Sequence, residues 1–426
     1  MVTPTTTARD RDYADLRAEM VDYLVQTTGD ARTPAVIAAL SKVPRHLVID
    51  EDDDVDPAET YAPEDALITK KDPDGSAISS ISAARIQAMQ LEQAHLRRGQ
   101  RILEVGSGGV NAAYLAEVVG PEGLVVTVDI DPEVTARARR FLAKTGHDDV
   151  VVITGDGATG VPDYAPFDRI VVTVEATDIA PGWWDQLADD GRIVAPMRMG
   201  GMTRTLSLAR DVADPDRLHA EDLQLCGFVP MQGPGTNPQD LIVLSQDADA
   251  RVALRLDGGT TEGFDADGLS SSLRNGRVET WTGVEIAGNE SFEHLDLWLA
   301  TSLAPILTLA PTRGAIDAGL VAPVLPYNAP TLVEGTSFTY RTARVVDNET
   351  RMCEIGVVAH GPDAEGVATR YAEQIAAWAI QRPTTAVVTV RRRTAETVPV
   401  PERPGPSARS RTISRPHSDL TISWPQ

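Results

Sequence analysis

The chain has 426 residues and a formal net charge of −23, so we expect two domains rather than one core, and no nucleic-acid partner. No apolar run is long enough to span a membrane and the N-terminus lacks the apolar stretch of a signal peptide, so we expect a cytoplasmic protein without a membrane partner. Two cysteines and seven scattered histidines offer neither a disulfide framework nor metal-ligand spacing, so we predict no metal.

The first part of the chain is predicted to combine helices with polar loops. Apolar residues at helical spacing predict helices over residues 10–45, ending near the sequence KVPRHL. Residues 50–80 are polar and are interpreted as loop, and the acidic run Asp50 to Asp56 is expected to be solvated. The helical pattern returns over residues 82–98.

Strand and helix patterns then alternate along the chain. Short apolar runs predict buried strands in RILEVG, LVVTVD, VVVITGD, FDRIVVTVE and GRIVAPM. The segments NAAYLAEVVG and DPEVTARARRFLAKTG have helical patterns, and the second has Pro132 in its first turn and Gly146 as its stop signal. This alternation predicts an α/β fold with a mostly parallel sheet covered on both faces.

The sequence changes character after about Gly235. Strand patterns such as QDLIVLS and RVALRLDGG, a hairpin around Asp347-Asn348, and two further helical segments predict a separate α+β domain. The last thirty residues are rich in Pro, Ser and Arg and are expected to be disordered. The predicted division is an N-terminal helical and loop region, an α/β core, an α+β accessory domain and a tail, over 1–80, 81–235, 236–395 and 396–426.

A glycine-rich turn follows the first strand of the α/β core and precedes a helix. Glycines at 106, 108 and 109 let the backbone approach a ligand, and the helix N-terminus offers unpaired N–H groups. Asp129 ends the next strand, where a carboxylate can accept hydrogen bonds from both hydroxyls of a ribose. Asp156-Gly157 ends the third strand, where a polar group can meet an adenine amino group. The plain alternative is that these are ordinary strand-end turns.

The details of this turn discriminate between nucleotides. A dinucleotide fingerprint requires a third glycine where Asn111 stands, which weakens the interpretation as a dehydrogenase. Glu104 before the turn and the Gly-Ser-Gly core instead look like the S-adenosylmethionine turn of Rossmann-like methyltransferases. The predicted cofactor-binding residues are Glu104, Gly106, Ser107, Gly108, Asn111, Asp129, Ile130, Asp156 and Gly157.

Residues from about 20 to 235 resemble the protein-L-isoaspartate O-methyltransferases. The segments that carry the resemblance, in chain order, are VPRHLV, YAPEDALI, SISAARIQAMQ, LEVGSG, VVTVDID, TGDGATG, FDRIVVTVEA, LADDGRIVAPM and GFVPM. The resemblance implies a Rossmann-like methyltransferase core that transfers a methyl group from S-adenosyl-L-methionine to a peptide carboxylate, leaving S-adenosyl-L-homocysteine.

The chemistry accounts for the serines before the core. An aspartyl or isoaspartyl carboxylate has an unperturbed pKa of about 4, so it is already ionised at pH 7 and needs positioning rather than a general base. Ser82 aligns with the site serine of the family, and Ser80 and Ser79 lie beside it, so these three are the predicted catalytic residues. Ser82 has an alternative role as a plain helix N-cap, and both roles are compatible.

Departures from the family lie on the acceptor side. Ala84 and Arg85 replace the usual Pro and aromatic or His, and KKDPDGSAIS replaces the expected Pro-Gln segment. The long C-terminal part is also foreign to the ordinary repair enzymes. This combination resembles a divergent branch associated with lanthipeptides and graspetides. That resemblance implies methylation of a normal aspartate in a cyclised ribosomal peptide, followed by an aspartimide that persists or hydrolyses to isoaspartate.

Three cations are predicted near the acceptor. Lys70, Lys71 and Arg85 form a candidate basic cluster for recruiting an acidic peptide, although three ordinary surface cations would give the same pattern. The predicted function is therefore methylation of an aspartate carboxylate in a modified peptide. Three alternatives stay open: isoaspartyl repair, a peptide-binding module without catalysis, and small-molecule methylation. The sequence does not indicate the oligomeric state.

Overall fold

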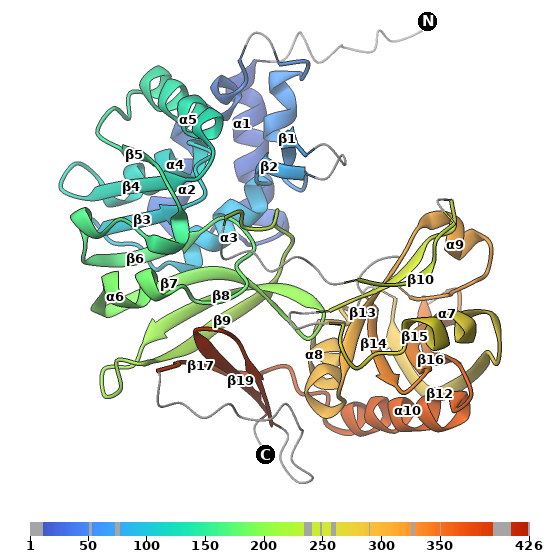
Figure 1. Cartoon of the computed structure of the whole chain (residues 1–426). Coiled ribbons are helices and arrows are strands. Elements are labelled where there is room, and N and C mark those ends of the chain that lie inside the picture. The colour runs from blue at the N-terminus through green and yellow to red at the C-terminus, as the bar shows by residue number, and fades with distance from the viewer. Residues whose placement is uncertain are drawn as a thin grey trace, which may run out of the picture. The chain divides into compact units, whose positions relative to one another are not determined.

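The computed structural model describes residues 12–50, 53–72, 77–233, 241–247, 249–256, 261–288, 290–324, 329–349, 351–394 and 410–424. The chain divides into two compact units (Figure 1). Unit 1 comprises Met1–Met197 and Arg204–Thr236, and unit 2 comprises Arg198–Thr203 and Asn237–Gln426. Among the described residues, no helix combines the length and the apolar composition needed to cross a membrane.

Unit 1 begins with helices, as the apolar spacing predicts. They are α1 (Tyr13–Asp22), which continues into the π-helical turn η2 (Tyr23–Thr27), and α2 (Pro34–Lys42). The Asp12 carboxylate accepts a hydrogen bond from Ala14 N at 3.0 Å and caps α1, and a proline occupies the first turn of α2. Two short 3₁₀ helices follow, η3 (Arg45–Val48) and η4 (Pro57–Tyr61).

A β-hairpin stands where the sequence led us to expect a loop. Strand β1 (Leu67–Lys71) pairs antiparallel with β2 (Ala77–Ile81), with Ile68 opposite Ser80 and Lys70 opposite Ser79. Lysine and serine have low strand propensity, so the pattern alone did not indicate the pairing. The helix predicted next in the chain follows as α3 (Ala84–Gln93), which is almost completely buried.

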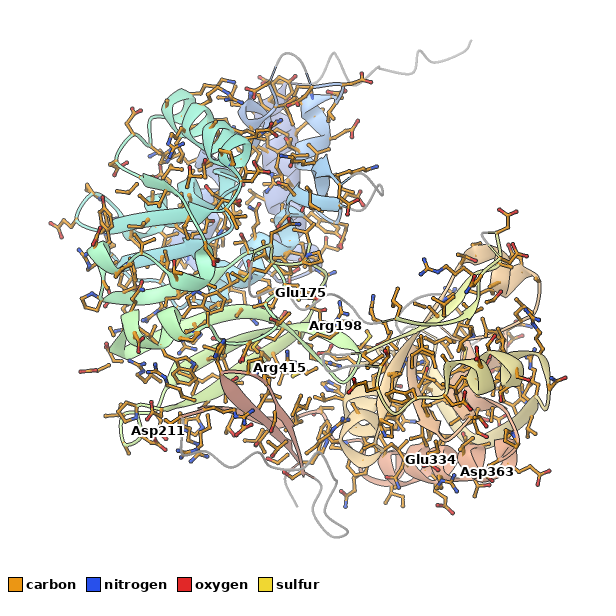
Figure 2. All side chains as sticks on the ribbon, viewed as in Figure 1. Glu175, Arg198, Asp211, Glu334, Asp363 and Arg415 are labelled. Atoms are coloured by element: carbon orange, nitrogen blue, oxygen red, sulfur yellow. The ribbon has the colours of Figure 1, made fainter. Side chains whose placement is uncertain are left out.

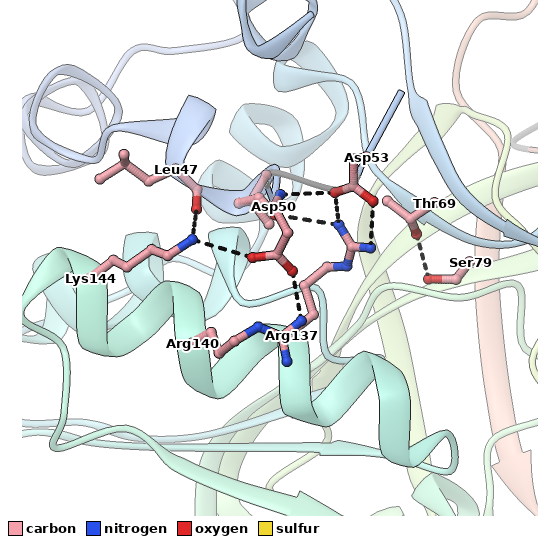
Figure 3. A network of polar contacts seen from close by, with 9 residues as sticks. Leu47, Asp50, Asp53, Thr69, Ser79, Arg137, Arg140 and Lys144 are labelled. Carbon is pink, nitrogen blue, oxygen red and sulfur yellow. Dashed lines mark hydrogen bonds and ion pairs between the residues drawn. The ribbon is translucent and has the colours of Figure 1, made fainter. Parts of the chain in front are cut away.

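The acidic run is not simply solvated. Asp53 accepts two hydrogen bonds from the Arg137 guanidinium, at 2.5 and 3.0 Å, and Asp50 accepts from Arg140 and Lys144 (Figure 3). All three cations lie on helix α5 (Pro132–Thr145). The run therefore attaches the N-terminal region to α5, a pairing that its composition did not predict.

The predicted parallel sheet is present in unit 1. Its strands are β3 (Arg101–Val105), β4 (Leu124–Asp129), β5 (Val151–Thr154), β6 (Phe167–Val172), β7 (Leu187–Met199), β8 (Met202–Arg210) and β9 (Arg217–Leu225). Their order is β9-β8-β7-β6-β3-β4-β5, and the strands from β3 to β7 pair in parallel. Helices α4 (Val110–Val119), α5 and α6 (Pro181–Gln186) connect them.

The strand order fixes the place of the site. The chain runs outward from β3 through β4 to β5, and then returns to the other side of β3 as β6. The connections that leave β3 and β6 therefore diverge, and open α/β sheets bind ligands at such a switch point, beyond the carboxyl ends of the strands. The glycine-rich turn lies at this position.

Unit 2 is built on a second sheet, antiparallel throughout. Its strands, in spatial order, are β10 (Leu241–Ser245), β11 (Val252–Arg255), β13 (Ile306–Pro311), β14 (Ala329–Glu334), β15 (Ser337–Asp347), β16 (Met352–His360) and β12 (Val278–Ala287). The predicted hairpin around Asp347-Asn348 is formed by β15 and β16. Its helices are α7 (Ala266–Arg274), α8 (Glu293–Ser302), α9 (Arg313–Asp317) and α10 (Ala364–Gln381).

Ion pairs attach the helices of unit 2 to its sheet. Asp296 of α8 and Arg341 of β15 form a bidentate pair with N–O distances of 2.7 and 2.8 Å, and both side chains are only 1% exposed. On α10, Arg370 contacts the carboxylates of Glu334 and Asp363. These two acidic residues are labelled in Figure 2. Arg341 Nη1 is buried without a hydrogen-bond partner among the described residues. A buried ion pair of this kind is therefore weak evidence for added stability.

Part of the expected disordered tail is folded. Strands β17 (Val387–Arg392), β18 (Ser410–Ser414) and β19 (Ser418–Ser423) form an antiparallel set in the order β18-β19-β17. The prediction of a tail over 396–426 followed overall composition and overlooked the period-two alternation near the end, where Ile413, Leu420 and Ile422 are buried. Residues 396–409 and 425–426 of that prediction lie outside the described residues.

Candidate active site

The glycine-rich turn joins β3 to α4 and depends on its glycines for two reasons. Gly106 and Gly109 have φ values of 98° and 81°, which side chains rarely adopt. A Cβ at Gly106 would lie 2.5 Å from Thr173 Oγ1, so the turn packs tightly against the end of β6. A Cβ at Gly108 would meet nothing within 4 Å, so this glycine borders open space that a ligand can enter.

Asp129 at the end of β4 is held between the turn and the start of α5. Its Oδ2 accepts a hydrogen bond from Ser107 N at 2.9 Å, and its Oδ1 accepts from Asp131 N at 2.9 Å. Burial raises the pKa of this carboxyl above its usual value. Each carboxylate oxygen has two lone pairs, so both can still accept a bond from a ribose hydroxyl.

Glu104 and Asn111 lie deeper than the sequence suggested. Asn111 Nδ2 donates to Glu104 Oε1 at 2.9 Å, and Thr127 Oγ1 donates to Glu104 Oε2 at 2.5 Å. Glu104 is fully buried, and burial raises its pKa to about 7 despite these donors. The two hydrogen bonds to Glu104 thus link β3 to α4 and to β4. Glu104 presents no exposed surface to a ligand in this conformation.

Two orphaned polar atoms show that the turn fits a polar ligand. Ser107 Oγ and Asn111 Oδ1 are buried and have no hydrogen-bond partner among the described residues. Buried polar atoms are normally satisfied, so each such atom requires an explanation. S-adenosylmethionine has an ammonium group and a carboxylate on its methionine part, which can satisfy an acceptor and a donor at this turn.

The ends of β4 and β5 meet at the same place. Ile130 is 39% exposed, and a Cβ on Gly233 would lie 3.3 Å from Ile130 Cδ1 and 3.6 Å from Asp156 Oδ1. Asp156 Oδ1 also caps the 3₁₀ turn Gly157–Thr159 by accepting from Ala158 N at 2.9 Å. An exposed aliphatic side chain beside a carboxylate suits an adenine ring with its amino group.

Gly157 is enclosed on two sides. A Cβ there would lie 2.6 Å from Val105 Cγ1, at the end of β3. The indole nitrogen of Trp183 donates to Gly157 O at 2.8 Å, and both Trp183 and Trp184 are buried, so these tryptophans act in packing. Donor-side residues predicted from three separate strand ends therefore gather at one edge of the sheet.

The three predicted serines do not form one group. Ser79 Oγ accepts a hydrogen bond from Thr69 Oγ1 at 3.0 Å (Figure 3), and successive strand residues point to opposite faces, so Ser80 points away from Ser79. Ser82 follows the strand, and its carbonyl accepts from Arg45 Nη2 at 3.0 Å. The N-cap of α3 is Ala83, without a side-chain cap, so Ser82 is not the helix cap.

The predicted basic cluster is divided between two sets of carboxylates. Lys70 Nζ lies 2.6 Å from carboxylate oxygens of both Asp131 and Glu133. Arg85 pairs with Asp30 at 2.8 Å and with Glu64 at 3.1 Å. Lys71 is exposed at the end of β1. Two of the three cations are thus already neutralised within the chain.

Sequence reasoning missed Arg45, which supports the acceptor side. Its guanidinium is buried and donates to Thr60 O at 2.6 Å, to Gln87 Oε1 and to Ser82 O. These bonds hold η4, α3 and the end of the serine strand together. The segment VPRHLV gave a usable signal, because an arginine in a segment with several apolar residues requires partners if that segment is buried.

Comparisons with known proteins agree with this arrangement. A model of the family described as protein-L-isoaspartate(D-aspartate) O-methyltransferase matches residues 16–235. Protein-L-isoaspartate O-methyltransferase 2 of Archaeoglobus fulgidus is 38% identical over 187 residues, which are 44% of this chain and 80% of that protein. The Methanopyrus kandleri protein-L-isoaspartate O-methyltransferase is 36% identical over 229 residues, 53% of this chain and 94% of that protein.

Solved structures with the same description are also similar. One protein-L-isoaspartate O-methyltransferase has a TM-score of 0.47 at 19% identity and covers 88% of this chain and 96% of its own. A second, from Plasmodium falciparum and in complex with S-adenosyl-L-homocysteine, has a TM-score of 0.43 at 16% identity and covers 52% and 99%.

The family match spans more than half of the chain and includes the donor-side turn. It confirms the predicted enzyme class, an S-adenosylmethionine-dependent carboxyl O-methyltransferase, and the predicted methyl donor. It leaves open the narrower prediction of a branch dedicated to ribosomal peptides. The chain belongs to the protein-L-isoaspartate(D-aspartate) O-methyltransferase family.

Proposed function

We propose that the chain methylates the side-chain carboxylate of an isoaspartyl residue in a protein or peptide. The observation that carries this proposal is the donor-side geometry, in which Asp129 is fixed between Ser107 N and Asp131 N beside a glycine turn with open space. It lies within the stretch matched by the family model. The relatives bear isoaspartate methyltransferase names, which favour this substrate over a normal aspartate.

The roles of the donor-side residues follow from their positions. Asp129 would hold the ribose, Ile130 and Asp156 the adenine, and the Ser107 turn the methionine part. When bound, the donor supplies an electrophilic methyl group. The fixed Asp129 carboxylate and the glycine turn would hold the donor in one orientation, which favours in-line positioning.

The acceptor side requires no general base, because the carboxylate is ionised near neutral pH. Ser82 would orient it by donating a hydrogen bond, which leaves the second oxygen free to attack. Ser80 would assist from the strand, and Lys71, the one predicted cation without an ion pair among the described contacts, stays a candidate for contacting the acceptor peptide.

Methylation of a normal aspartate in a cyclised ribosomal peptide is the second candidate. The observation that favours it is the folded unit 2, since the family match ends at residue 235. In this reaction the following backbone nitrogen attacks the methyl ester, and methanol leaves as the aspartimide forms. Unit 2 would supply a recognition surface, and a preorganised ring loses less conformational entropy on binding than a linear chain.

One factorial experiment separates these candidates. A single peptide sequence is prepared in linear and ring-closed forms, each with either isoaspartate or aspartate, and ester formation is followed by mass spectrometry. Isoaspartyl methylation predicts turnover of both isoaspartyl forms and none of the aspartyl forms. Turnover of the cyclic aspartyl form alone, followed by net loss of water, would establish the second candidate. Binding without turnover of any form would indicate a peptide-binding module.

A further inference from the structure

Lys70 links two elements that are far apart in the sequence. It lies on β1, and its ammonium group contacts Asp131 and Glu133 at the start of α5, 61 and 63 residues away. Both carboxylates help to raise the pKa of Lys70, and the Lys70 side chain is 34% exposed. Exposed ion pairs of this kind contribute little to stability, so a role in folding does not account for the contact.

The contact continues directly into the donor site. Asp131 uses Oδ2 for Lys70, while its Oδ1 accepts from Glu133 N at 2.8 Å and caps α5. The backbone N–H of the same residue donates to Asp129 Oδ1, and Ser107 N donates to Asp129 Oδ2. A series of contacts without a gap therefore joins Lys70 to the carboxylate assigned to the donor ribose.

The same lysine is joined to the acceptor serines on its other side. Lys70 is aligned with Ser79 across the hairpin, and Ile68 is aligned with Ser80. The neighbouring Thr69 donates from its hydroxyl to Ser79 Oγ at 3.0 Å. Strand β2 then leads directly to Ser82, so a displacement of β1 also displaces the serines.

We propose that Lys70 is a positioning residue that fastens the serine-bearing hairpin to the donor-binding loop and so couples donor binding to acceptor placement. This inference rests on the proposed function, because it takes Asp129 as the ribose carboxylate and the serines as the acceptor side. Coupling between two sites is reciprocal. Donor binding should therefore order β1 and β2. Loss of the lysine contact should in turn weaken donor binding by the factor with which the donor favours the ordered hairpin.

Hydrogen exchange of the full chain, with and without S-adenosyl-L-homocysteine, tests the coupling without an acceptor. In the wild type we expect the ligand to slow exchange both at Gly106–Gly109 and in β1 and β2. In Lys70→Met the slowing should persist at the glycine turn and disappear from the hairpin, with binding about 5-fold weaker, at the low end of usual coupling. Lys70→Arg, which keeps the donors, should behave as the wild type.

Two further variants control for indirect effects. Lys71→Met removes a cation from the same strand but leaves both Lys70 ion pairs, so ligand-induced protection of the hairpin should be retained. Asp131→Asn/Glu133→Gln still caps α5 but removes both charges that Lys70 contacts, so it should lose hairpin protection as Lys70→Met does. Adding Lys70→Met to this variant should cause no further loss of hairpin protection. Because these substitutions on the α5 side break the same contact, the coupling can still be tested if Lys70→Met does not fold.

The possible results distinguish the Lys70 coupling from the donor site on which it rests. Equal hairpin protection in the wild type and Lys70→Met would overturn the coupling. Ligand binding that protects the glycine turn but leaves the wild-type hairpin unchanged would also overturn it, while leaving the donor site intact. Absence of protection at the glycine turn itself would contradict the donor site and, with it, the coupling.

Discussion

Asp129 receives two backbone hydrogen bonds before any ligand is present, from Ser107 N and from Asp131 N. These bonds fix the direction of its remaining lone pairs, which is the preorganisation that a ribose site requires. The sequence predicted this residue from its place at a strand end. It did not predict that the same carboxylate also shapes the glycine turn.

Replacing Asp129 with alanine should weaken binding of S-adenosyl-L-homocysteine by about 1.5–3 kcal/mol, the usual contribution of hydrogen bonds to a charged group. Titration calorimetry measures the change. Asp149→Ala, at an exposed position, serves as the matched control, and Asp129→Asn tests the charge alone. Unchanged affinity in both Asp129 variants would remove this residue from the donor site. Wild-type affinity for NAD with none for S-adenosyl-L-homocysteine would reject the donor assignment.

Ser82 is the predicted acceptor residue that the geometry leaves most available, because the helix-cap role falls to Ala83. Ser82→Ala should preserve affinity for S-adenosyl-L-homocysteine and lower kcat/KM for an isoaspartyl peptide by about 10–100-fold, the equivalent of one hydrogen bond to a charged acceptor. The control is Ser41→Ala, an exposed serine that bonds only within its own helix. Equal turnover of Ser82→Ala and the wild type would leave Ser82 without a role in catalysis.

Glu104 gives the site a measurable pH dependence. Its native pKa of about 7 exceeds the usual glutamate pKa of 4.5, so between these pH values the native state binds more protons than the unfolded state. Stability must then fall as the pH rises through this window, by about 3 kcal/mol at the upper limit. Glu104→Gln, which cannot ionise, should therefore gain stability relative to the wild type on going from pH 5 to pH 8.

Urea unfolding at the two pH values provides the comparison for Glu104. The control is Glu122→Gln, the same substitution at an exposed position, which should follow the wild type. If the wild type and Glu104→Gln lose stability equally between pH 5 and pH 8, Glu104 is ionised throughout. The free-energy cost of burying the Glu104 carboxylate would then be smaller than its complete burial indicates.

At the scale of elements, the apolar runs of the α/β core and the hairpin around Asp347-Asn348 were predicted correctly, whereas two strand pairings in polar segments were not. The strands that end at Val105, Asp129 and Thr154 follow from apolar runs, whereas their order in the sheet was not predicted. The β1–β2 hairpin escaped prediction because a strand with Lys70 and Lys71 has no apolar face to recognise. The folded end of the chain escaped because its Pro, Ser and Arg content concealed an alternation of buried residues.

The buried pair between α8 and β15 makes a sharp prediction for unit 2. Arg341→Met leaves the Asp296 carboxylate buried and unpaired, which should lower the free energy of unfolding by about 3–5 kcal/mol. Asp296→Leu/Arg341→Met removes both charges and should cost less than the single substitution. Urea unfolding measures both variants. With Asp296→Leu as the second single variant, a double variant that loses the sum of the two single losses would show no coupling between the two charges and would contradict this prediction.

At the scale of the whole molecule, charge governs how an acceptor approaches. The formal net charge is −23, and the sequence suggested a local basic cluster that would offset it. The structure instead pairs Lys70 and Arg85 with four carboxylates of the chain. Such pairings join residues far apart in the sequence, so no local pattern could have revealed them. The expected attraction for an acidic peptide consequently loses most of its basis.

The surface should therefore disfavour acidic acceptors. Two isoaspartyl peptides that differ only in flanking Glu or Lys residues are compared between about 50 and 300 mM salt, a range over which the screening length falls roughly from 14 to 6 Å. We expect a higher kcat/KM for the Lys-flanked peptide at low salt, and a difference that narrows as salt screens the field. A matched pair flanked by Gln and Ser corrects for salt effects on the enzyme itself. Preference for the Glu-flanked peptide, weakening with salt, would instead restore a basic acceptor surface and identify Lys71 as the first cation to mutate.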